Sequence, residues 1–552
     1  MRRMGMKRYI STCFAAIGAF TVSSSLMAET LIHNVKGYSL NAQKQLVQFE
    51  ALAFDGNKIT GIYKKTPEEG KFDKVIDGKG QSLLPGLIDA HGHVLGYGMA
   101  LSSVDLVGTA SLAEAQKRIR EQSQKKQTGW VTGRGWNQEL WTSKQFPTAK
   151  AIDEYVSERP VMLARIDGHA LWVNSKAMEL AGISRTTVSP AGGDIIKDEQ
   201  GNPTGVLIDN AMDLVYKVMP KITEQERQFY LLKSLNALAA TGLTSVHDAG
   251  VSPEVINSYK TLQQQGKLPI RVYAMLAVTA EGADDVLKAG IYESDDGMLS
   301  VRSVKISADG ALGSRGAALH HDYSDKPGQK GLLLHSIPNL GKYVDAAMIA
   351  GFQVNIHAIG DRANTLVLDE FAKWHNVAGK AELRHRIEHA QIIRPQELPR
   401  LAQLQVIASM QPTHATSDKN MAEDRLGKER IKGAYAWASL RELGVVLAGG
   451  SDFPVEPAEP FFGLHAAVTR QDRNNEPLGG WYINEAVDRQ TALEMFTFNA
   501  AYAAHQENLI GTLEVGKEAD FILTEQDYFE VIPEDIWKIK VNETWVAGDK
   551  VL

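Results

Sequence analysis

The chain has 552 residues, of which 44% are hydrophobic and 23% are charged. This is ordinary globular composition, with enough length for one large domain with additions or for two to four domains. The formal net charge of −7 argues against a nucleic-acid-binding protein, because such proteins need a basic surface.

Residues 1–28 are predicted to form a secretory signal peptide that is cleaved after Ala28. A basic start, which includes Arg2 and Arg8, precedes the apolar run "CFAAIGAFTV" and the small-residue end "SLMA". The alternative is a membrane anchor, but the apolar run is too short to cross about 30 Å of hydrocarbon. Cleavage removes Cys13, the single cysteine. We therefore expect an exported, periplasmic protein without disulfides.

Both ends of the mature chain are rich in short alternating stretches broken by glycine and aspartate. The first such segment, residues 29–84, includes "LVQFEALAFDGNKITGIY", and the second, residues 506–552, includes "WKIKVNETWVAGDKVL". This pattern is typical of antiparallel strands and hairpins. We therefore predict one composite β-sandwich domain built from both termini.

Residues 85–505 are predicted to form a (β/α)8 TIM barrel, an α/β fold. Apolar strand-like runs alternate there with longer amphipathic segments, as in parallel βα units. Eight such runs are found, the number that a closed barrel requires: "GLIDAHGH", "GLTSVHDAG", "IRVYAML", "VRSVKISADG", "FQVNIHAIG", "RHRIEHAQ", "QVIASMQPTH" and "GVVLAGGSDFP". The segment between the first two runs is too long for a structureless loop. We therefore expect an inserted α+β subdomain at residues 98–235, after barrel strand 1.

Six residues on these runs have side chains suited to a divalent metal ion. They are His91, His93, Lys305, His357, His389 and Asp452. Side chains two positions apart in a strand share a face, so the first two histidines point the same way. The polar residues gather toward the carboxyl ends of the strands, where barrel active sites lie. Imidazole and carboxylate suit zinc and related ions, so the set predicts one or two divalent ions, with Zn²⁺ expected.

Lys305 and Asp452 have further chemical roles in this interpretation. A lysine inside a packed barrel is costly as an ammonium unless it is paired or chemically changed. Its neutral amine can take up carbon dioxide to become a carbamate, an oxygen ligand able to bridge two ions. Asp452 would take the proton from the nucleophilic water and pass it to the leaving nitrogen.

The motifs resemble those of the amidohydrolase superfamily. The likeness is carried by "PGLIDAHGH", "VKISADGALGSRGAAL", "NIHAIGDRA", "RIEHAQ", "GGSDFPVEP" and "GTLEVGKEADFIL". Within the insertion, "RIDGHALWVNSKAMELAGI" is similar to the branch that includes N-substituted formamide deformylase (amidohydrolase family 3). The resemblance implies a metal-bearing (β/α)8 barrel with a composite β-sandwich. It places His91, His93, His357, His389 and Asp452 in ligand positions and suggests a carbamylated Lys305 as bridging ligand.

Six further residues are candidates for substrate binding: Trp136, His169, Trp172, Asp309, Arg315 and His414. The three in the insertion could line a pocket for an apolar group at the barrel mouth, or equally form the insertion's own core. Arg315 could bind a carboxylate or carbonyl, or could equally pair with an acid. His414 follows the seventh strand and is a further pocket candidate.

The sequence therefore predicts a metal-dependent hydrolase acting on a non-peptide carbon–nitrogen bond of a small amide, N-acyl or N-formyl compound. The same metal site could instead hydrolyse a cyclic amide, deaminate a ring, or cleave an ester or phosphotriester, since fold does not determine the bond. A third hypothesis, a catalytically retired binding protein, is disfavoured by the intact ligand set. The expected partner is a small-molecule substrate, with no nucleic acid and no membrane after signal cleavage. A homodimer is compatible with the sequence.

Overall fold

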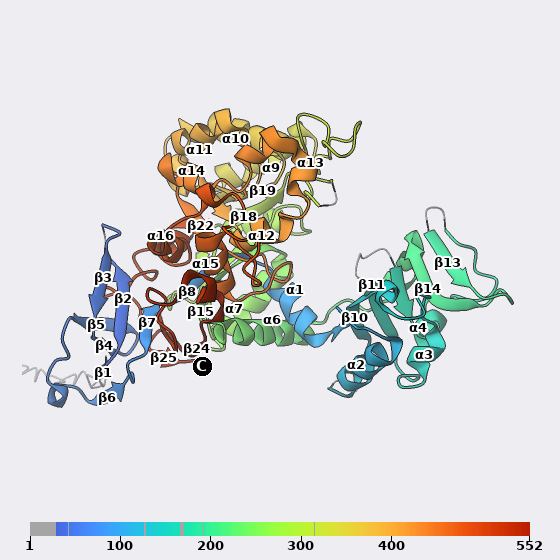
Figure 1. Ribbon diagram of the computed structural model, residues 1–552, viewed down its shortest axis with the longest axis horizontal. Helices are drawn as coiled ribbons and strands as arrows, with labels where there is room; N and C mark the ends of the chain where they lie inside the picture. The colour runs from blue at the N-terminus through green and yellow to red at the C-terminus, as the bar shows by residue number, and fades with distance from the viewer. Residues whose placement is uncertain (1–28, 42, 126–127, 166–169, 191–192, 314) are drawn as a thin grey trace, which may run out of the picture.

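A barrel, a β-sandwich and an inserted subdomain make up the computed structural model of the chain (Figure 1). The structure describes residues 29–41, 43–125, 128–165, 170–190, 193–313 and 315–552. The predicted signal peptide lies outside these residues. Within them, no helix combines the length and the apolar character needed to cross a membrane.

Eight parallel strands form the barrel, and they neighbour one another in chain order. Their burial on both faces explains why the sequence reads as near-continuous apolar runs. The strands are β8 (Leu87–Gly92), β15 (Leu243–Val251), β16 (Arg271–Ala277), β18 (Leu299–Ser307), β19 (Gln353–Ala358), β20 (Arg386–His389), β21 (Ile407–Met410) and β22 (Leu447–Gly449). All eight coincide with the runs read from the sequence, so the predicted (β/α)8 fold is confirmed.

The barrel closes where its first strand meets its last. Just beyond β22, the backbone N–H of Asp452 donates to the carbonyl of His91, at 2.7 Å. The Ser451 hydroxyl donates to the Asp89 carboxylate on β8, at 2.6 Å. The seam between the two strands is thus held by the segments that carry predicted metal ligands.

Helices surround the barrel and fill the crossovers between its strands (Figure 1). They are α6 (Glu224–Ala239), α7 (Pro253–Gln264), α8 (Ala283–Ala289), α9 (Ile337–Ile349), α10 (Asp361–His375), α11 (Leu398–Gln403), α14 (Trp437–Glu442), α15 (Pro460–Thr469), α16 (Arg489–Met495) and α17 (Phe498–Ala503). Two further helices, α12 (Pro412–Asp418) and α13 (Ala422–Arg430), follow β21 at the carboxyl end of the barrel. A Pro at the first helical position and a serine cap begin α7, as in many helix starts.

The sandwich is assembled from both ends of the described chain. One sheet has the order β5-β4-β1-β6 and the other β25-β24-β23-β7-β2-β3. The strands are β1 (Thr30–His33), β2 (Lys36–Leu40), β3 (Leu46–Phe49), β4 (Ala51–Asp55), β5 (Lys58–Tyr63), β6 (Lys74–Asp77), β7 (Ser82–Pro85), β23 (Phe521–Thr524), β24 (Val541–Val546) and β25 (Asp549–Lys550).

A buried ion-pair cluster joins the sandwich to the barrel. The Arg271 guanidinium, at the start of β16, donates to Asp520 at 2.8 and 3.0 Å and to Glu518 at 2.9 Å. The arginine side chain is fully buried and the two carboxylates are nearly so. Buried charges of this kind are stable only as a paired set.

The insertion forms its own six-stranded sheet and stands apart from the barrel (Figure 1). It contains β9 (Val104–Asp105), β10 (Val131–Trp136), β11 (Val161–Arg165), β12 (Ala170–Val173), β13 (Gly193–Lys197), β14 (Pro203–Asp209), α2 (Leu112–Lys125), α3 (Ala149–Asp153), α4 (Ser175–Leu180) and α5 (Asp213–Tyr216). The chain leaves the barrel through α1 (Val94–Ser102) and returns through α6. These helices pack so closely that a Cβ on Gly98 would lie 1.9 Å from the Tyr230 carbonyl oxygen.

Candidate active site

A cavity of 360 Å³ lies at the carboxyl ends of the barrel strands. All six predicted metal ligands line it, together with His414. Each ligand stands at or near the end of a different strand, except that the two histidines of the first motif flank Gly92 at the end of β8. Parallel strands present their carboxyl ends at one face of a barrel, which is why residues so distant in sequence converge here.

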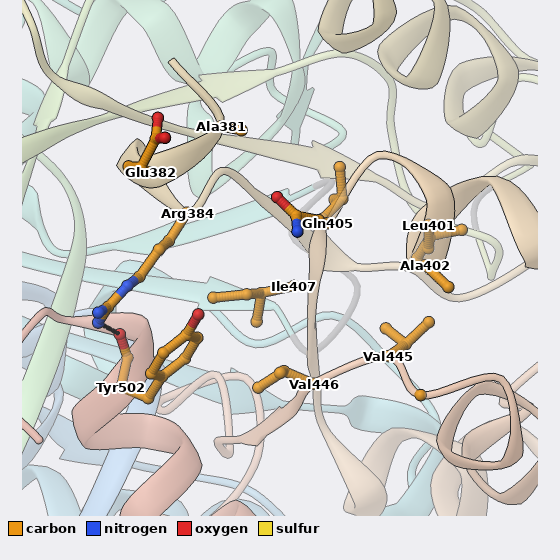
Figure 2. Close-up of a pocket in the computed structure, with 12 residues that line it drawn as sticks. Ala381, Glu382, Arg384, Leu401, Ala402, Gln405, Ile407, Val445, Val446 and Tyr502 are labelled. Atoms are coloured by element: carbon orange, nitrogen blue, oxygen red, sulfur yellow. Dashed lines mark hydrogen bonds between the residues drawn. The ribbon is translucent and has the colours of Figure 1, made fainter. Parts of the chain in front are cut away.

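A second hollow, of 480 Å³, lies at the opposite end of the barrel (Figure 2). Its residues precede the strands: Arg384 comes before β20, Gln405 before β21 and Val446 before β22. The Arg384 guanidinium is already bound to Glu507 and to the Tyr502 carbonyl oxygen, at 2.7 Å each. Among its described lining residues Glu382 is the one carboxylate and there is no histidine, so this hollow lacks the cluster of ligands found in the first cavity.

His91, His93 and Asp452 form a group whose ligand atoms lie close enough to share one ion. Asp452 Oδ1 is 3.1 Å from His93 Nε2 and 3.7 Å from His91 Nε2. Two ligands about 2 Å from a common zinc ion would lie at such a separation.

The contacts of His93 favour a cation between its ring and Asp452. Its Nδ1 lies 2.9 Å from the Ala249 carbonyl oxygen, so Nδ1 carries the proton in the neutral ring. The unprotonated Nε2 then faces a carboxylate oxygen of Asp452, lone pair against lone pair. A metal ion or an added proton between these two atoms removes the repulsion.

A second group uses the other oxygen of Asp452, with His389 and His414. His414 Nε2 is 3.7 Å from Asp452 Oδ2, and the ring of His357 lies 4.5 Å from that of His389. Among the described residues, the buried Nε2 atoms of His357 and His414 and the Oδ1 atom of Asp452 have no hydrogen-bond partner. Buried polar atoms without partners are rare, so these atoms are free to hold an ion.

Lys305 is buried at the floor of the cavity, near the end of β18. Its Nζ donates to His91 Nε2 at 3.1 Å, and no described carboxylate forms an ion pair with it. Burial lowers the pKa of this lysine below its ordinary value, against the pull of Glu388 and Asp452. The neutral amine is therefore more accessible here than on a surface lysine.

Behind the ligands, a layer of polar groups fixes the histidine rings. His91 Nδ1 donates to Glu388, and the Glu388 carboxylate pairs with Arg386 at 2.7 Å. His389 Nδ1 donates to the Gln411 side-chain oxygen, at 2.7 Å. A metal-binding histidine commonly donates its other ring nitrogen in this way, which fixes the ring orientation and tautomer.

Sequence analysis did not identify Glu388, Arg386 or Gln411 as parts of the site. The alternation of side chains along a strand could have identified two of them. Arg386 and Glu388 are two positions apart on one short strand and therefore share a face. Arg386 also reaches His247 Nδ1 at 3.0 Å, which makes that histidine part of the supporting network.

The protonation states favour metal binding. Burial lowers the pKa of His91 to about 4 and that of His357 to about 3, so both rings are neutral at pH 7. Burial opposes ionisation of Asp452, but the close contact with His93 and the neighbouring histidines His91, His389 and His414 hold its pKa below the usual range. The site thus offers neutral imidazoles and an ionised carboxylate, the forms that bind metals.

Backbone conformation is unusual at two of the ligands. His389 and Asp452 have φ values of 72° and 65°, in the left-handed region. Non-glycine residues adopt it rarely, and such strain concentrates at functional sites.

The structure places the insertion tryptophans far from this cavity. Trp136 and Trp172 are fully buried and pack with Trp141 in the core of the insertion. Their indole N–H groups donate to the carbonyls of Leu163 and Thr148. His169 lies outside the described residues.

Asp309 and Arg315 do not line the cavity in the structure. The buried Asp309 carboxylate accepts three backbone N–H groups, from Ala318, Ile359 and Gly360, and so ties together the loops after β18 and β19. Arg315 pairs with Asp325 at 2.7 Å.

Comparison with known proteins decides the family. The sequence matches the Amidohydrolase family over residues 74–552. The chain belongs to this family. As an amidohydrolase it is an enzyme that hydrolyses carbon–nitrogen bonds, with a candidate His/Asp metal site.

The relatives of this amidohydrolase span nearly its whole length. A protein of Bacillus subtilis (strain 168) named as an amidohydrolase, YtcJ, is 31% identical over 90% of this chain and 94% of its own. N-substituted formamide deformylase of Arthrobacter pascens is 27% identical over 95% of this chain and 98% of its own. The crystal structure of an uncharacterized metal-dependent hydrolase from Pyrococcus horikoshii OT3 has a TM-score of 0.76 and 27% identity, and covers 92% of this amidohydrolase and 99% of that chain.

Proposed function

We propose that this amidohydrolase cleaves the carbon–nitrogen bond of a small N-acyl or N-formyl amide. The observation that carries the proposal is the position of Asp452, whose two carboxylate oxygens face different histidines inside one cavity. A carboxylate so placed can bind an ion and move a proton. The relative named N-substituted formamide deformylase supports the amide over other bonds.

The ligand set fits a divalent ion, for which Zn²⁺ is proposed. Neutral imidazoles presenting Nε2, with one carboxylate, are characteristic zinc ligands. When bound, such an ion supplies a water activated for attack near neutral pH and polarises the carbonyl under attack. His91, His93, His357, His389 and Asp452 would hold it, with one or two ions in the site.

We propose that Lys305 becomes a carbamate. Its amine nitrogen bonds to the carbon of carbon dioxide and loses one proton, which leaves a carbamate with two oxygens. The lowered pKa of Lys305 favours the neutral amine that this reaction needs. The carbamate carries a negative charge. It would replace a buried ammonium group with which no described carboxylate forms an ion pair.

Asp452 is proposed as the proton carrier. Its carboxylate would accept the proton of the attacking water and deliver it to the leaving nitrogen, so that an amine departs in place of an unstable amide anion. The free Nε2 of His414, 3.7 Å from Asp452 Oδ2, is placed to contact the same reacting groups.

The test is a panel of substrates with the metal-loaded enzyme. Formamides and acetamides of simple amines are compared with matched esters, cyclic amides, phosphotriesters and amino-substituted rings. We expect the highest kcat/KM for the open-chain amides. Preferential turnover of another class would overturn the amide assignment, and tight binding without turnover of any class would indicate a retired enzyme.

Export is a separate proposal that depends on residues 1–28 alone. Expression of the full chain in a bacterium, followed by fractionation and N-terminal sequencing, tests it. A periplasmic protein beginning just after Ala28 is expected, whereas an intact N-terminus inside the cell would contradict it.

A further inference from the structure

We propose that the active-site cavity selects amides whose amine half ends in a positive charge, and that Asp418 recognises this charge. The proposal deepens the proposed function and rests on it, because it names the substrate class of the same site.

Apart from the predicted metal ligands, the charged side chains that line the cavity are negative. The remaining acidic side chains that line it are Asp418 and Glu456, and apart from histidines the one basic side chain among the described lining residues is Lys305 at the floor. No described arginine lines the cavity, because Arg315 lies outside it and is bound to Asp325. Apart from the candidate metal centre, the wall therefore offers two carboxylates to a ligand, and no arginine is found among the described lining residues.

Asp418 is held in place by two buried side chains. The Tyr435 hydroxyl donates to its Oδ2 at 2.6 Å, and the Gln391 amide donates to the same oxygen at 3.0 Å. Tyr435 and Gln391 are themselves in contact, at 2.7 Å, and are only 2% and 3% exposed. A carboxylate fixed in this way needs little further ordering when it binds a ligand.

The other oxygen of Asp418 is left without a partner. No described hydrogen bond reaches Oδ1, and no described lysine or arginine forms an ion pair with Asp418 or Glu456. The adjacent Lys419 is committed elsewhere, to Asp472 and to the Glu476 carbonyl oxygen. Asp418 therefore retains an acceptor and a full charge for a ligand in the cavity.

The same cavity holds the candidate metal centre, at which the amide would be cleaved. Asp452 is 7% exposed, and its Oδ1 has no hydrogen-bond partner among the described residues. Leu312, Ile359 and Val455 also line the cavity and supply apolar surface. A short methylene chain fits such a surface, with the amide at the metal centre and an ammonium at Asp418.

This arrangement also predicts which amides are rejected. An N-acyl amino acid that binds with its amide at the metal centre would bring its free carboxylate toward Asp418 and Glu456, with which no described lysine or arginine forms an ion pair. Like charges brought together in a partly enclosed site are unfavourable, so such amides should be poor substrates.

Three formamides test the proposal. All carry the same four-carbon chain on the amide nitrogen, and they differ only in the group at the end of that chain, which is an ammonium, a methyl or a carboxylate. We expect kcat/KM to be about tenfold higher for the ammonium than for the methyl compound, and lowest for the carboxylate. In Asp418→Asn, kcat/KM for the ammonium compound should fall about tenfold while that for the methyl compound changes less than about twofold. The conservative amide keeps the shape and an acceptor for Tyr435.

Asp424→Asn is the matched control, because Asp424 is exposed on α13 and does not line the cavity. It makes the same change of net charge and should leave the ammonium preference intact. Equal loss in both variants would show that general attraction, and not recognition by Asp418, causes the preference. Equal kcat/KM for the ammonium and methyl compounds in the unmodified enzyme would also overturn the proposal, while leaving the amide hydrolase intact.

A further experiment separates failure of the charge preference from failure of the proposed amide hydrolysis. If no formamide is cleaved, uncleavable ketone analogues of the ammonium and methyl compounds are titrated into the metal-loaded protein by calorimetry. Tighter binding of the ammonium analogue, lost in Asp418→Asn, would support the charge preference without amide hydrolysis. Equal binding of the two analogues would overturn it.

Discussion

Asp452 Oδ1 lies 3.1 Å from His93 Nε2, although the two residues belong to the last and the first strand regions of the barrel. The His93 ring donates its one proton to the Ala249 carbonyl oxygen on the other side. A neutral His93 and an ionised Asp452 are therefore stable at this distance only with a cation between them. The pair is therefore the centre of both proposals, metal binding and proton transfer.

Asp452→Asn should abolish turnover while the fold stays intact. Asparagine tolerates the positive φ of this position, so the backbone can remain as it is. Loss of the proton carrier should lower kcat by about a hundredfold to ten-thousandfold. Steady-state kinetics and circular dichroism measure the two effects, and retained activity would refute the mechanism.

Metal content should depend on Lys305. Elemental analysis of enzyme purified in bicarbonate buffer should give about two divalent ions per chain, as in other two-metal hydrolases. Lys305→Ala should lower that value, because the variant cannot form the proposed carbamate. One ion, insensitive to the substitution, would leave a hydrolase without the bridge.

Glu388→Gln should weaken metal binding without removing a ligand. The amide cannot hold the His91 ring and balance Arg386 as the carboxylate does, so metal affinity should fall about tenfold to a hundredfold. Competition with a chelator measures this affinity. Glu370→Gln provides the control, since Glu370 is also buried but pairs with Lys373 on α10. An equal effect in both variants would indicate general destabilisation.

Arg271→Met should destabilise the junction between barrel and sandwich. The substitution leaves the buried Asp520 without an ion-pair partner among the described residues and leaves Glu518 paired only with Lys58. Breaking a buried ion pair typically costs about 3–5 kcal/mol. Urea unfolding measures the loss. Adding Glu518→Gln and Asp520→Asn to the variant should recover part of it, and no recovery would show that packing, and not charge, is responsible.

Stability should fall as pH falls from about 6.5 to about 4, with His385 as one cause. Burial lowers the pKa of this residue to about 4, below that of an unfolded histidine. The unfolded chain therefore binds more protons in this pH range, so acid favours unfolding by up to about 3 kcal/mol at pH 4. His385→Asn keeps an acceptor for the Val354 N–H, and its free energy of unfolding should vary less with pH than that of the unmodified enzyme. An identical pH slope in both proteins would contradict this assignment.

The strands could be predicted from the sequence because a parallel barrel buries each strand as a short apolar run. The convergence of His91, His93, Lys305, His357, His389 and Asp452 followed from strand direction alone. The hydrogen bonds between side chains from different segments of the barrel could not be predicted. Asp418 acquires its setting from Tyr435 and Gln391, which belong to other segments.

In the insertion, residue type alone did not distinguish a ligand-binding role from a packing role. Trp136 and Trp172 could be read either as pocket walls or as core, because tryptophan serves both. Their contacts with Trp141 and with backbone carbonyls place them in the core. Arg315 had the same ambiguity, and the structure pairs it with Asp325.

The seam between β8 and β22 has a consequence for biosynthesis. It joins the earliest barrel strand to the latest, and the Asp452 amide closes it on the His91 carbonyl. A chain still being made contains His91 and His93 long before it contains Asp452. A metal site that needs both motifs can therefore be complete only after the last strand of the barrel has been added.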